Sequence, residues 1–297
     1  MELGRLLTAM VTPFDREGQV DYEQAKRLAL ALLESGSDGL VVAGTTGESP
    51  TLSHEEKLTL FGEVKAAVGN RGAVIAGTGT YNTAESVELT RTAEQIGVDG
   101  VLLTTPYYSK PPQEGLYRHF AAIAGATSLP CIIYNIPGRT AVNVTAETQV
   151  RLAEIPNMVG VKESSGDLGQ ISEIIRRAPH FRVWSGDDPL TLPIMAVGGY
   201  GVVSVVAHLV GTQIKRMIEA HLAGDAQQAA AIHQQLAPLI TTIMTAAPSP
   251  IPLKCALNHI GFHVGGLRLP LVEADAAVTE RVVAEVGRQQ IDLAVAV

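Results

Sequence analysis

Residues 39–77 read GLVVAGTTGESPTLSHEEKLTLFGEVKAAVGNRGAVIAG, and they decide the fold class. A short apolar run opens this stretch, a turn rich in Gly, Thr and Ser follows, and a helical pattern extends over Ser53–Val68. Ser53 and Glu56, three residues apart, form a capping box, and Gly69 stands where a helix C-cap is expected. A second apolar run closes the stretch, which therefore predicts one strand–helix–strand unit.

The same order recurs along the first two thirds of the chain. The predicted strands are Leu6–Val11, Gly39–Ala43, Ala73–Gly77, Gly100–Thr104, Cys131–Asn135, Met158–Val161, Arg182–Ser185 and Gly201–Val206. The predicted helices are Asp21–Ser35, Ser53–Val68, Thr83–Ile96, Gln113–Ala124, Thr145–Ala153, Leu168–Arg177, Leu190–Val197 and Thr212–Ala223. Eight strand-then-helix units of about 25 residues favour a closed (β/α)8 TIM barrel over an open doubly wound sheet.

The repeating order ends after Ala223, and only helical patterns follow. They cover Ala226–Ala246, Ile251–Ile260 and Ala274–Gln289. We predict a barrel over residues 1–224 with the active site, and a C-terminal helical region over residues 225–297 that carries no chemistry. His259 and His263 could share one helix face, but Gly261 and the lack of an HExxH glutamate argue against a metal site. We expect neither a metal nor a cofactor.

Composition excludes several classes of protein. The chain has 297 residues, of which 46% are hydrophobic and 18% charged, enough for one large α/β domain or two ordinary ones. Its net charge of −8 gives no basic surface for nucleic acid and no polybasic patch for a membrane. Cys131 and Cys255 are too few for a disulfide framework and fit buried thiols in a reducing cytoplasm.

Two apolar stretches require separate consideration. Leu6–Val11 is too short for the core of a signal peptide, so we expect a cytoplasmic protein. Pro189–Ile214 contains no Asp, Glu, Lys or Arg, but Pro, Gly and His residues interrupt it. A packed helix followed by a buried strand explains this second stretch better than a membrane span.

Candidate chemical groups follow the predicted strands, where a TIM barrel carries its active site. Hydroxyl groups, one lysine and one arginine gather there, whereas His and Cys are nearly absent, which argues against Ser-His-Asp, Cys-His and zinc mechanisms. The segments are Thr12-Pro13, Gly44–Ser49, Gly77–Thr80, Thr105–Tyr108, Tyr134–Thr140, Lys162 and Ser185–Asp188.

Nucleotide binding has little support. Gly77–Thr80 lacks the third glycine of a GxGxxG turn, and the chain contains no GxxxxGK[ST] motif. Thr45 and Thr46 offer hydroxyls and amides suited to a carboxylate, although Thr is also common at strand ends because of its β propensity.

Lys162 directly follows the apolar run Met158–Val161, so its ammonium group lies where a buried strand ends. Desolvation favours the neutral amine, which can attack a ketone and form a Schiff base. The alternative is a lysine whose stem packs while its charged end reaches water. Glu163 should point to the opposite side, toward the helical layer, because strand residues alternate in direction.

Three ordered motifs carry a family resemblance: Gly44–Glu48, Tyr134–Thr140 and Gly160–Glu163. They resemble the signatures of the dihydrodipicolinate synthase / N-acetylneuraminate lyase superfamily of class I aldolase-type barrels, and the similarity runs from Leu6 to about Leu271. The Pro-x-Arg-Thr form at Pro137–Thr140 resembles the synthase branch, as does Thr105–Tyr108. Lyases of N-acetylneuraminate and aldolases of 2-keto-3-deoxy sugar acids, which release pyruvate, generally lack that arginine and form the alternative.

The resemblance implies a Schiff base between Lys162 and pyruvate, whose enamine attacks L-aspartate 4-semialdehyde in the diaminopimelate and lysine pathway. Tyr134 would transfer protons through Thr45 and through Tyr108 of a neighbouring subunit. Thr46 would bind the pyruvate carboxylate and Arg139 that of the second substrate. The backbones at Gly186 and Val203 would line the site.

The implied tyrosine relay requires a dimer, and the superfamily is usually a dimer of dimers, so we expect a homotetramer. A barrel that only senses a keto acid is a further alternative, disfavoured by the joint presence of Lys162, Tyr134 and Thr45. Members inhibited by lysine place a His, an Asn and a Glu at an interface cleft. Here the matching residues are His54, Lys57, Tyr81 and Glu85, so we do not expect L-lysine to inhibit the protein.

Overall fold

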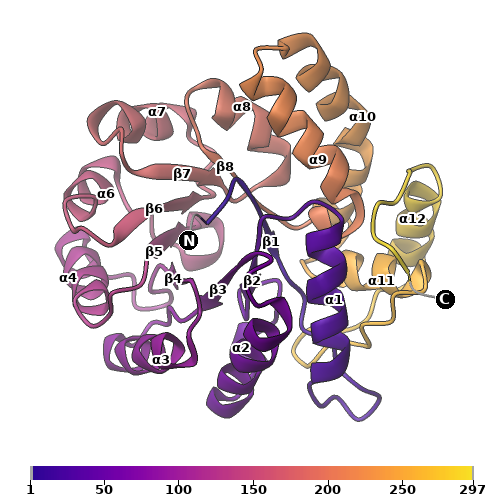
Figure 1. The fold of residues 1–297 in the computed structure, drawn as a ribbon, viewed down its shortest axis with the longest axis horizontal. Helices are drawn as coiled ribbons and strands as arrows, with labels where there is room; N and C mark the ends of the chain where they lie inside the picture. Colours follow the sequence, from indigo (N-terminus) through magenta and orange to yellow (C-terminus); the bar gives the residue numbers. More distant parts are fainter. Residues whose placement is uncertain (1–2, 296–297) are drawn as a thin grey trace.

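Eight parallel strands close into a barrel in the computed structural model, which describes residues 3–295. Each strand pairs with the next, and β8 pairs with β1 (Figure 1). The strands are β1 (Leu6–Ala9), β2 (Gly39–Val42), β3 (Ala73–Gly77), β4 (Gly100–Thr104), β5 (Cys131–Asn135), β6 (Met158–Glu163), β7 (Arg182–Ser185) and β8 (Gly201–Ser204). The predicted TIM barrel is therefore confirmed.

Helices surround the strands and alternate with them along the chain. They are α1 (Tyr22–Glu34), α2 (His54–Val68), α3 (Thr83–Ile96), α4 (Gln113–Ala124), α5 (Pro137–Thr140), α6 (Ala146–Leu152), α7 (Leu168–Arg177), α8 (Thr191–Ala196) and α9 (Ala207–Leu222). Short 3-10 turns, η1 (Ser49–Thr51) and η2 (Asp188–Leu190), precede α2 and α8. The capping box predicted at the start of α2 is present: Ser53 and Glu56 each accept a hydrogen bond from the other's backbone.

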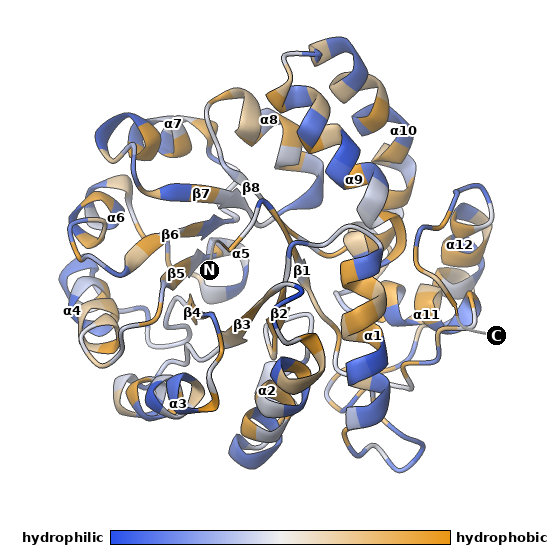
Figure 2. Cartoon of the chain, in the orientation of Figure 1, coloured by the Kyte–Doolittle hydropathy of each residue, from blue (hydrophilic) through white to orange (hydrophobic). Residues whose placement is uncertain are grey.

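Alternation along the strands divides the apolar side chains into two clusters. One fills the inside of the barrel and includes Leu7, Ile75, Trp184 and Val203. The other lies between the strands and the surrounding helices, whose sequences mix hydrophobic and hydrophilic residues as amphipathic helices do (Figure 2). The inner cluster fills the barrel below the polar residues that follow the strand ends.

Four strands end at residues other than those predicted, among them β1, which ends at Ala9 rather than Val11, and β2, which ends at Val42 rather than Ala43. β6 extends two residues beyond Val161, because Lys162 and Glu163 still pair in register with β5 and β7. β8 ends at Ser204 rather than Val206, since the carboxylate of Asp188 accepts the backbone N–H groups of the two residues that follow and turns the chain.

Apart from differences of one to three residues at helix ends, the helices differ from the prediction in two places. α9 begins at Ala207, five residues before the predicted Thr212, with the hydroxyl of Ser204 accepting the N–H of Ala207. A kink at Val210 interrupts this helix near its start. The segment after β5, where no helix was predicted before Thr145, forms the short helix α5.

The C-terminal region adds α10 (Ala226–Thr245), α11 (Ile251–His259) and α12 (Ala276–Val286) beside α9 and α1 (Figure 1). One hydrophobic cluster contains residues of the barrel helices and residues of these three helices, among them Leu236, Leu257 and Val282. The core therefore continues across the predicted boundary at residues 224 and 225, and the division into domains stays a prediction.

The charge-free stretch from Pro189 to Ile214 forms α8, β8 and the first half of α9. The prediction of a packed helix followed by a buried strand is thus confirmed. Within residues 3–295, no helix combines the length and the apolar character that crossing a membrane requires.

Candidate active site

Lys162 and Tyr134 lie side by side inside the barrel. β5 and β6 pair in parallel with Tyr134 opposite Lys162, so both side chains point to the same face of the sheet. The Lys162 Nζ atom lies 4.1 Å from the centre of the Tyr134 ring, and each residue is only 4% exposed. An amine on an aromatic face, shielded from water, is therefore the centre of the candidate site.

Gly186 lies against the side chain of Lys162. A Cβ atom built at this glycine would lie 3.1 Å from both Cγ and Cε of Lys162 and 2.0 Å from Oγ of Ser164. Only a residue without a side chain leaves this space to the lysine. Val203, another predicted site residue, is fully buried on β8 and belongs to the inner cluster with Tyr134 and Trp184.

Thr45 and Thr46 lie in the loop after β2. Thr46 is buried, whereas Thr45 lines a cavity of about 220 Å³. The loop is bounded by two non-glycine residues with left-handed backbone, Ala43 at φ 52° and Glu48 at φ 57°. Gly77 of β3 permits this close path, because a Cβ atom there would lie 2.4 Å from the carbonyl oxygen of Ala43.

Arg139 lines the same cavity from the other side of the barrel mouth. It lies on α5, which Thr140 stabilises by donating its hydroxyl to the carbonyl oxygens of Ile136 and Val142. The cavity wall includes Thr45, Lys57, Thr80, Tyr107 and Arg139, and leaves Lys162 and Tyr134 outside it. Burial lowers the pKa of the Lys57 ammonium, and the nearby Glu85 carboxylate opposes that shift.

Left-handed backbone is concentrated at this end of the barrel. In the described chain the non-glycine residues with positive φ are Ala43, Glu48, Tyr108, Lys110 and Ala141. All of them lie in the segments that follow β2, β4 and β5. Such conformations cost about 1–3 kcal/mol each and persist where the surrounding structure holds them, which is typical of functional sites.

Two acidic residues follow β7 beside the lysine. Burial raises the pKa of the Asp187 carboxyl, while the positive charges of Lys162 and Arg139 act to lower it and Asp188 acts to raise it. Asp187 thus lies within the electrostatic reach of both predicted cationic residues. Burial also raises the pKa of Asp188, whose carboxylate accepts hydrogen bonds from Ser204 and from the backbone of β8's end.

Glu163 points away from the site, as predicted. Its carboxylate accepts hydrogen bonds from Asn135 Nδ2 at 2.9 Å, Gln149 Nε2 at 3.0 Å and the backbone N–H of Ser165 at 2.9 Å, all outside the barrel. Burial raises the pKa of the Glu163 carboxyl, and these donors oppose the shift. The network ties the end of β5 to the end of β6, so it fixes the strand ends that carry Tyr134 and Lys162.

The model of the dihydrodipicolinate synthetase family matches residues 2–289. The chain belongs to this family. The resemblance drawn from the sequence is confirmed, and so is the expected kind of enzyme, since the family's synthases are lyases that form a Schiff base.

Relatives within the dihydrodipicolinate synthetase family are similar over nearly the whole chain. A 4-hydroxy-tetrahydrodipicolinate synthase of Dehalococcoides mccartyi is 60% identical over 275 residues, which is 92% of each chain. That of Moorella thermoacetica is 58% identical over 285 residues, covering 96% of this chain and 97% of the relative. The crystal structure of a dihydrodipicolinate synthase from Bacillus anthracis superposes with a TM-score of 0.95 at 45% identity, covering 98% of this chain and 99% of the other.

One of the residues matched to the family motifs lies apart from the others in this chain. Tyr108 is 94% exposed, with left-handed backbone at φ 69°, and its side chain extends into solvent rather than toward Tyr134. The preceding Tyr107 is half-buried and packs edge-on against Tyr81, with ring centres 5.2 Å apart. Lys162, Tyr134, Gly186 and Val203 are therefore brought together within one chain, and Tyr108 is not.

Sequence reasoning missed Ser164. Its Oγ atom is buried and has no hydrogen-bond partner within residues 3–295, and it lies close to the space beside Gly186 and Lys162. The alternation of strand residues was the available signal, because the second residue after Lys162 points to the same side.

The C-terminal region contacts one of the loops that carry predicted site residues, and sequence reasoning missed this contact. Lys254 of α11 forms an ion pair with Glu48 of the loop after β2, with Nζ and Oε1 2.7 Å apart. The two residues are 206 positions apart in the sequence, so no local pattern could have predicted the contact.

Proposed function

We propose that this protein is a 4-hydroxy-tetrahydrodipicolinate synthase that condenses pyruvate with L-aspartate 4-semialdehyde through a Schiff base on Lys162. The observation that carries the proposal is the buried Lys162 amine over the face of Tyr134, at the end of β6. Family membership and the names of the relatives support the same reaction.

The amine of Lys162 attacks C2 of pyruvate to form a carbinolamine, which loses water to give the imine. Removal of a proton from the pyruvate methyl group gives an enamine, whose carbon attacks the aldehyde carbon of the second substrate. The amino group of that substrate then attacks the imine carbon, closes the ring and releases the lysine amine. Burial of Lys162 supports this sequence, because water competes poorly for an imine in a shielded site.

We assign the proton transfers in these steps to Tyr134. Its position opposite Lys162 supports the role, since a general acid or base must lie within hydrogen-bond reach of the reacting atoms. A phenol ordinarily has a pKa near 10, so it needs partners that pass the proton onward. We assign these partners as Thr45 and Tyr108 of a second subunit, consistent with the exposure of Tyr108 in its own chain.

The carboxylate groups of the substrates require donors. Thr46, with its hydroxyl and backbone amide, holds the carboxylate of pyruvate, while the guanidinium of Arg139 binds that of the second substrate in a bidentate manner. Gly186 and Val203 line the space between them. The presence of Thr45 and Arg139 in one cavity wall supports this arrangement.

The proposed relay makes the dimer the smallest complete unit, and we propose a homotetramer built from two such dimers. The acidic composition and the biosynthetic reaction fit a protein of the cytoplasm.

Reduction with borohydride in the presence of pyruvate tests the mechanism. We expect peptide mass analysis to find one reduced pyruvate on Lys162 and none in the variant Lys162→Met. An unmodified Lys162 in the wild type would refute the imine. Coupled assays with aspartate semialdehyde and with 2-keto-3-deoxy sugar acids or N-acetylneuraminate then separate a synthase from a pyruvate-forming aldolase, and cleavage of a sugar acid alone would favour the latter.

A further inference from the structure

Glu48 ends the loop that carries Thr45 and Thr46. Its backbone N–H donates to the carbonyl oxygen of Thr45 at 3.1 Å, and its own carbonyl oxygen accepts from the backbone N–H and the hydroxyl of Thr51. The residue has left-handed backbone at φ 57°, a conformation that a residue with a side chain adopts only when other contacts hold it. The position of Glu48 therefore determines the path of the loop at the two threonines.

The contacts that hold Glu48 come from the C-terminal region. Lys254 of α11 pairs with the Glu48 carboxylate at 2.7 Å, and the two side chains are 1% and 0% exposed. The same ammonium donates to the carbonyl oxygen of Gly266 at 2.7 Å and lies 4.2 Å from the centre of the Phe14 ring. Burial lowers the pKa of Lys254 to about 8, while Glu48 acts in the opposite direction.

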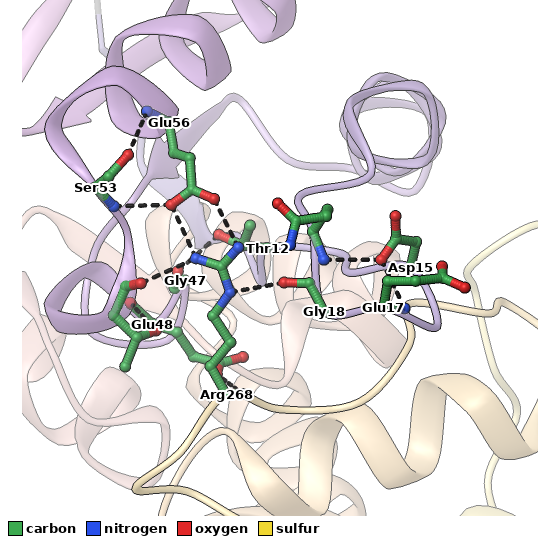
Figure 3. Close-up of polar contacts among 11 residues, drawn as sticks. Thr12, Asp15, Glu17, Gly18, Gly47, Glu48, Ser53, Glu56 and Arg268 are labelled. Atoms are coloured by element: carbon green, nitrogen blue, oxygen red, sulfur yellow. Dashed lines mark hydrogen bonds and ion pairs between the residues drawn. The ribbon is translucent and has the colours of Figure 1, made fainter.

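Arg268 holds the other carboxylate oxygen. Its backbone N–H donates to Oε2 of Glu48 at 3.0 Å, and its guanidinium donates to both carboxylate oxygens of Glu56 at 2.6 and 2.8 Å. Further donations reach the carbonyl oxygens of Thr51 and Gly18 (Figure 3). Arg268 thus connects Glu48 to the start of α2 and to the loop after β1.

A hydrogen bond from the loop after β1 adds to this arrangement. The hydroxyl of Thr12 donates to the carbonyl oxygen of Gly47 at 2.6 Å, directly before Glu48 (Figure 3). Gly47 is packed closely, since a Cβ atom there would lie 3.0 Å from the carbonyl oxygen of Met10. The loop is therefore held on both sides, by β1 and by the C-terminal region.

We propose that Lys254 and Arg268 are positioning residues for catalysis, which hold Glu48 so that Thr45 and Thr46 face pyruvate. This inference rests on the proposed function, because it assigns the threonines to the pyruvate site. A carboxylate buried to this extent stays in place only with a counter-charge. Without Lys254, Glu48 leaves its pocket for water, the left-handed turn relaxes, and the two threonines leave the positions at which we assign them to pyruvate.

A purely structural ion pair would have a different effect. Lys65 and Asp99 supply the comparison, because they pair at the same N–O distance of 2.7 Å and are also largely buried, at 19% and 13% side-chain exposure. Asp99 immediately precedes β4, and its carboxylate accepts the N–H of Val74 in β3, so this pair lies away from the loops that carry the predicted site residues. Lys65→Met therefore serves as the matched control for Lys254→Met.

The experiment measures the pyruvate concentration that half-saturates borohydride trapping at Lys162, which requires no second substrate. We expect Lys254→Met to raise that concentration about tenfold, with Lys65→Met unchanged. Arg268→Met keeps the backbone bond to Glu48 but loses the guanidinium contacts with Glu56 and Thr51 that fix this backbone, so we expect a rise of about threefold. All three variants should lower the melting temperature. Because the side chain of Arg268 is 19% exposed and that of Lys254 only 1%, the Arg268 variant tests the inference even where Lys254→Met does not fold.

Hydrogen exchange of the backbone over residues 44–52 gives a second measurement that is independent of catalysis. We expect faster exchange there in Lys254→Met and Arg268→Met, and not in Lys65→Met. The positioning role would be overturned if all three variants had the same half-saturating pyruvate concentration and the same hydrogen exchange over residues 44–52. Absence of any adduct in the wild type would instead refute the proposed function, and the exchange of residues 44–52 would still decide whether the loop depends on Lys254.

Discussion

Replacement of Glu163 by Gln tests whether the buried carboxylate has a structural or a catalytic role. The change replaces one carboxylate oxygen by an NH2 group, whereas the partners of the carboxylate are all N–H groups that need an acceptor. At Oε1 these are Asn135 Nδ2 and the N–H of Ser165; at Oε2 they include Gln149 Nε2. Whichever oxygen is exchanged, buried N–H groups then face another N–H group.

The size of the effect follows from which donors keep another acceptor. Asn135 Nδ2 also donates to Asn143 Oδ1 at 2.8 Å, and Gln149 Nε2 also donates to the carbonyl oxygen of Val144 at 2.8 Å. About one buried donor is therefore left without a partner, and we expect the free energy of unfolding to fall by about 1–3 kcal/mol. Turnover should stay within about threefold of the wild type, because the carboxylate lies on the side of β6 away from Lys162.

Urea unfolding and steady-state kinetics measure the two quantities. Glu147→Gln is the matched control, since the same change on the neighbouring helix α6 affects a carboxylate that is 66% exposed and pairs with Arg177. Its unfolding free energy should change by less than about 0.5 kcal/mol. A Glu163→Gln enzyme with wild-type stability and a turnover reduced about a hundredfold would refute the reasoning, because the carboxylate would then act in the reaction.

Three further predictions concern titration, substrate binding and assembly. Burial lowers the pKa of His208 to about 4, so below about pH 6.5 the unfolded chain takes up a proton that the folded protein does not. The free energy of unfolding therefore decreases as the pH is lowered from about 6.5 to about 4. Between about pH 7 and about pH 5 urea unfolding should lose roughly 2 kcal/mol more in the wild type than in His208→Gln, which keeps a donor and an acceptor; identical losses would contradict this. Arg139→Lys should raise the KM for aspartate semialdehyde about tenfold through loss of bidentate pairing while pyruvate trapping is unaffected, and a rise in the KM for pyruvate instead would assign Arg139 to the other substrate. Tyr108→Phe should lower turnover at least about tenfold, and mixing it with inactive Lys162→Ala subunits should restore activity, because the mixed dimer has one complete site; no recovery would place Tyr108 outside the partner's site.

Much of the barrel could be predicted because its strands are buried on both faces. Such strands form continuous apolar runs, and the start of α2 carries a capping box, so its N-cap, Ser53, was predicted correctly. Lys162 and Gly186 could be predicted as site residues for the same reason, since each directly follows such a run. The side to which Glu163 points followed from the alternation of strand residues alone.

Contacts between distant residues could not be predicted. α5 is too short for a helical period to be visible, and the start of α9 is hidden because Val205, Val206 and Leu209 continue the apolar pattern of β8. The hydrogen bonds of Asp188 end that strand, and Asp188 lies sixteen positions before Ser204. The pair of Glu48 and Lys254 depends on tertiary packing in the same way.

The pairing of β8 with β1, together with the pairing of Lys254 with Glu48, has a consequence for biosynthesis. The ribosome releases β1 and the loop after β2 well before their partners, since the strand that covers β1 ends at Ser204 and the counter-charge for Glu48 arrives only with α11. At about 5–20 residues per second, the nascent chain exposes an unpaired strand edge and an uncompensated carboxylate for on the order of ten seconds. The barrel is therefore completed only after β8 and α11 have been synthesised, and chains that terminate before α11 are natural clients for chaperones and proteases.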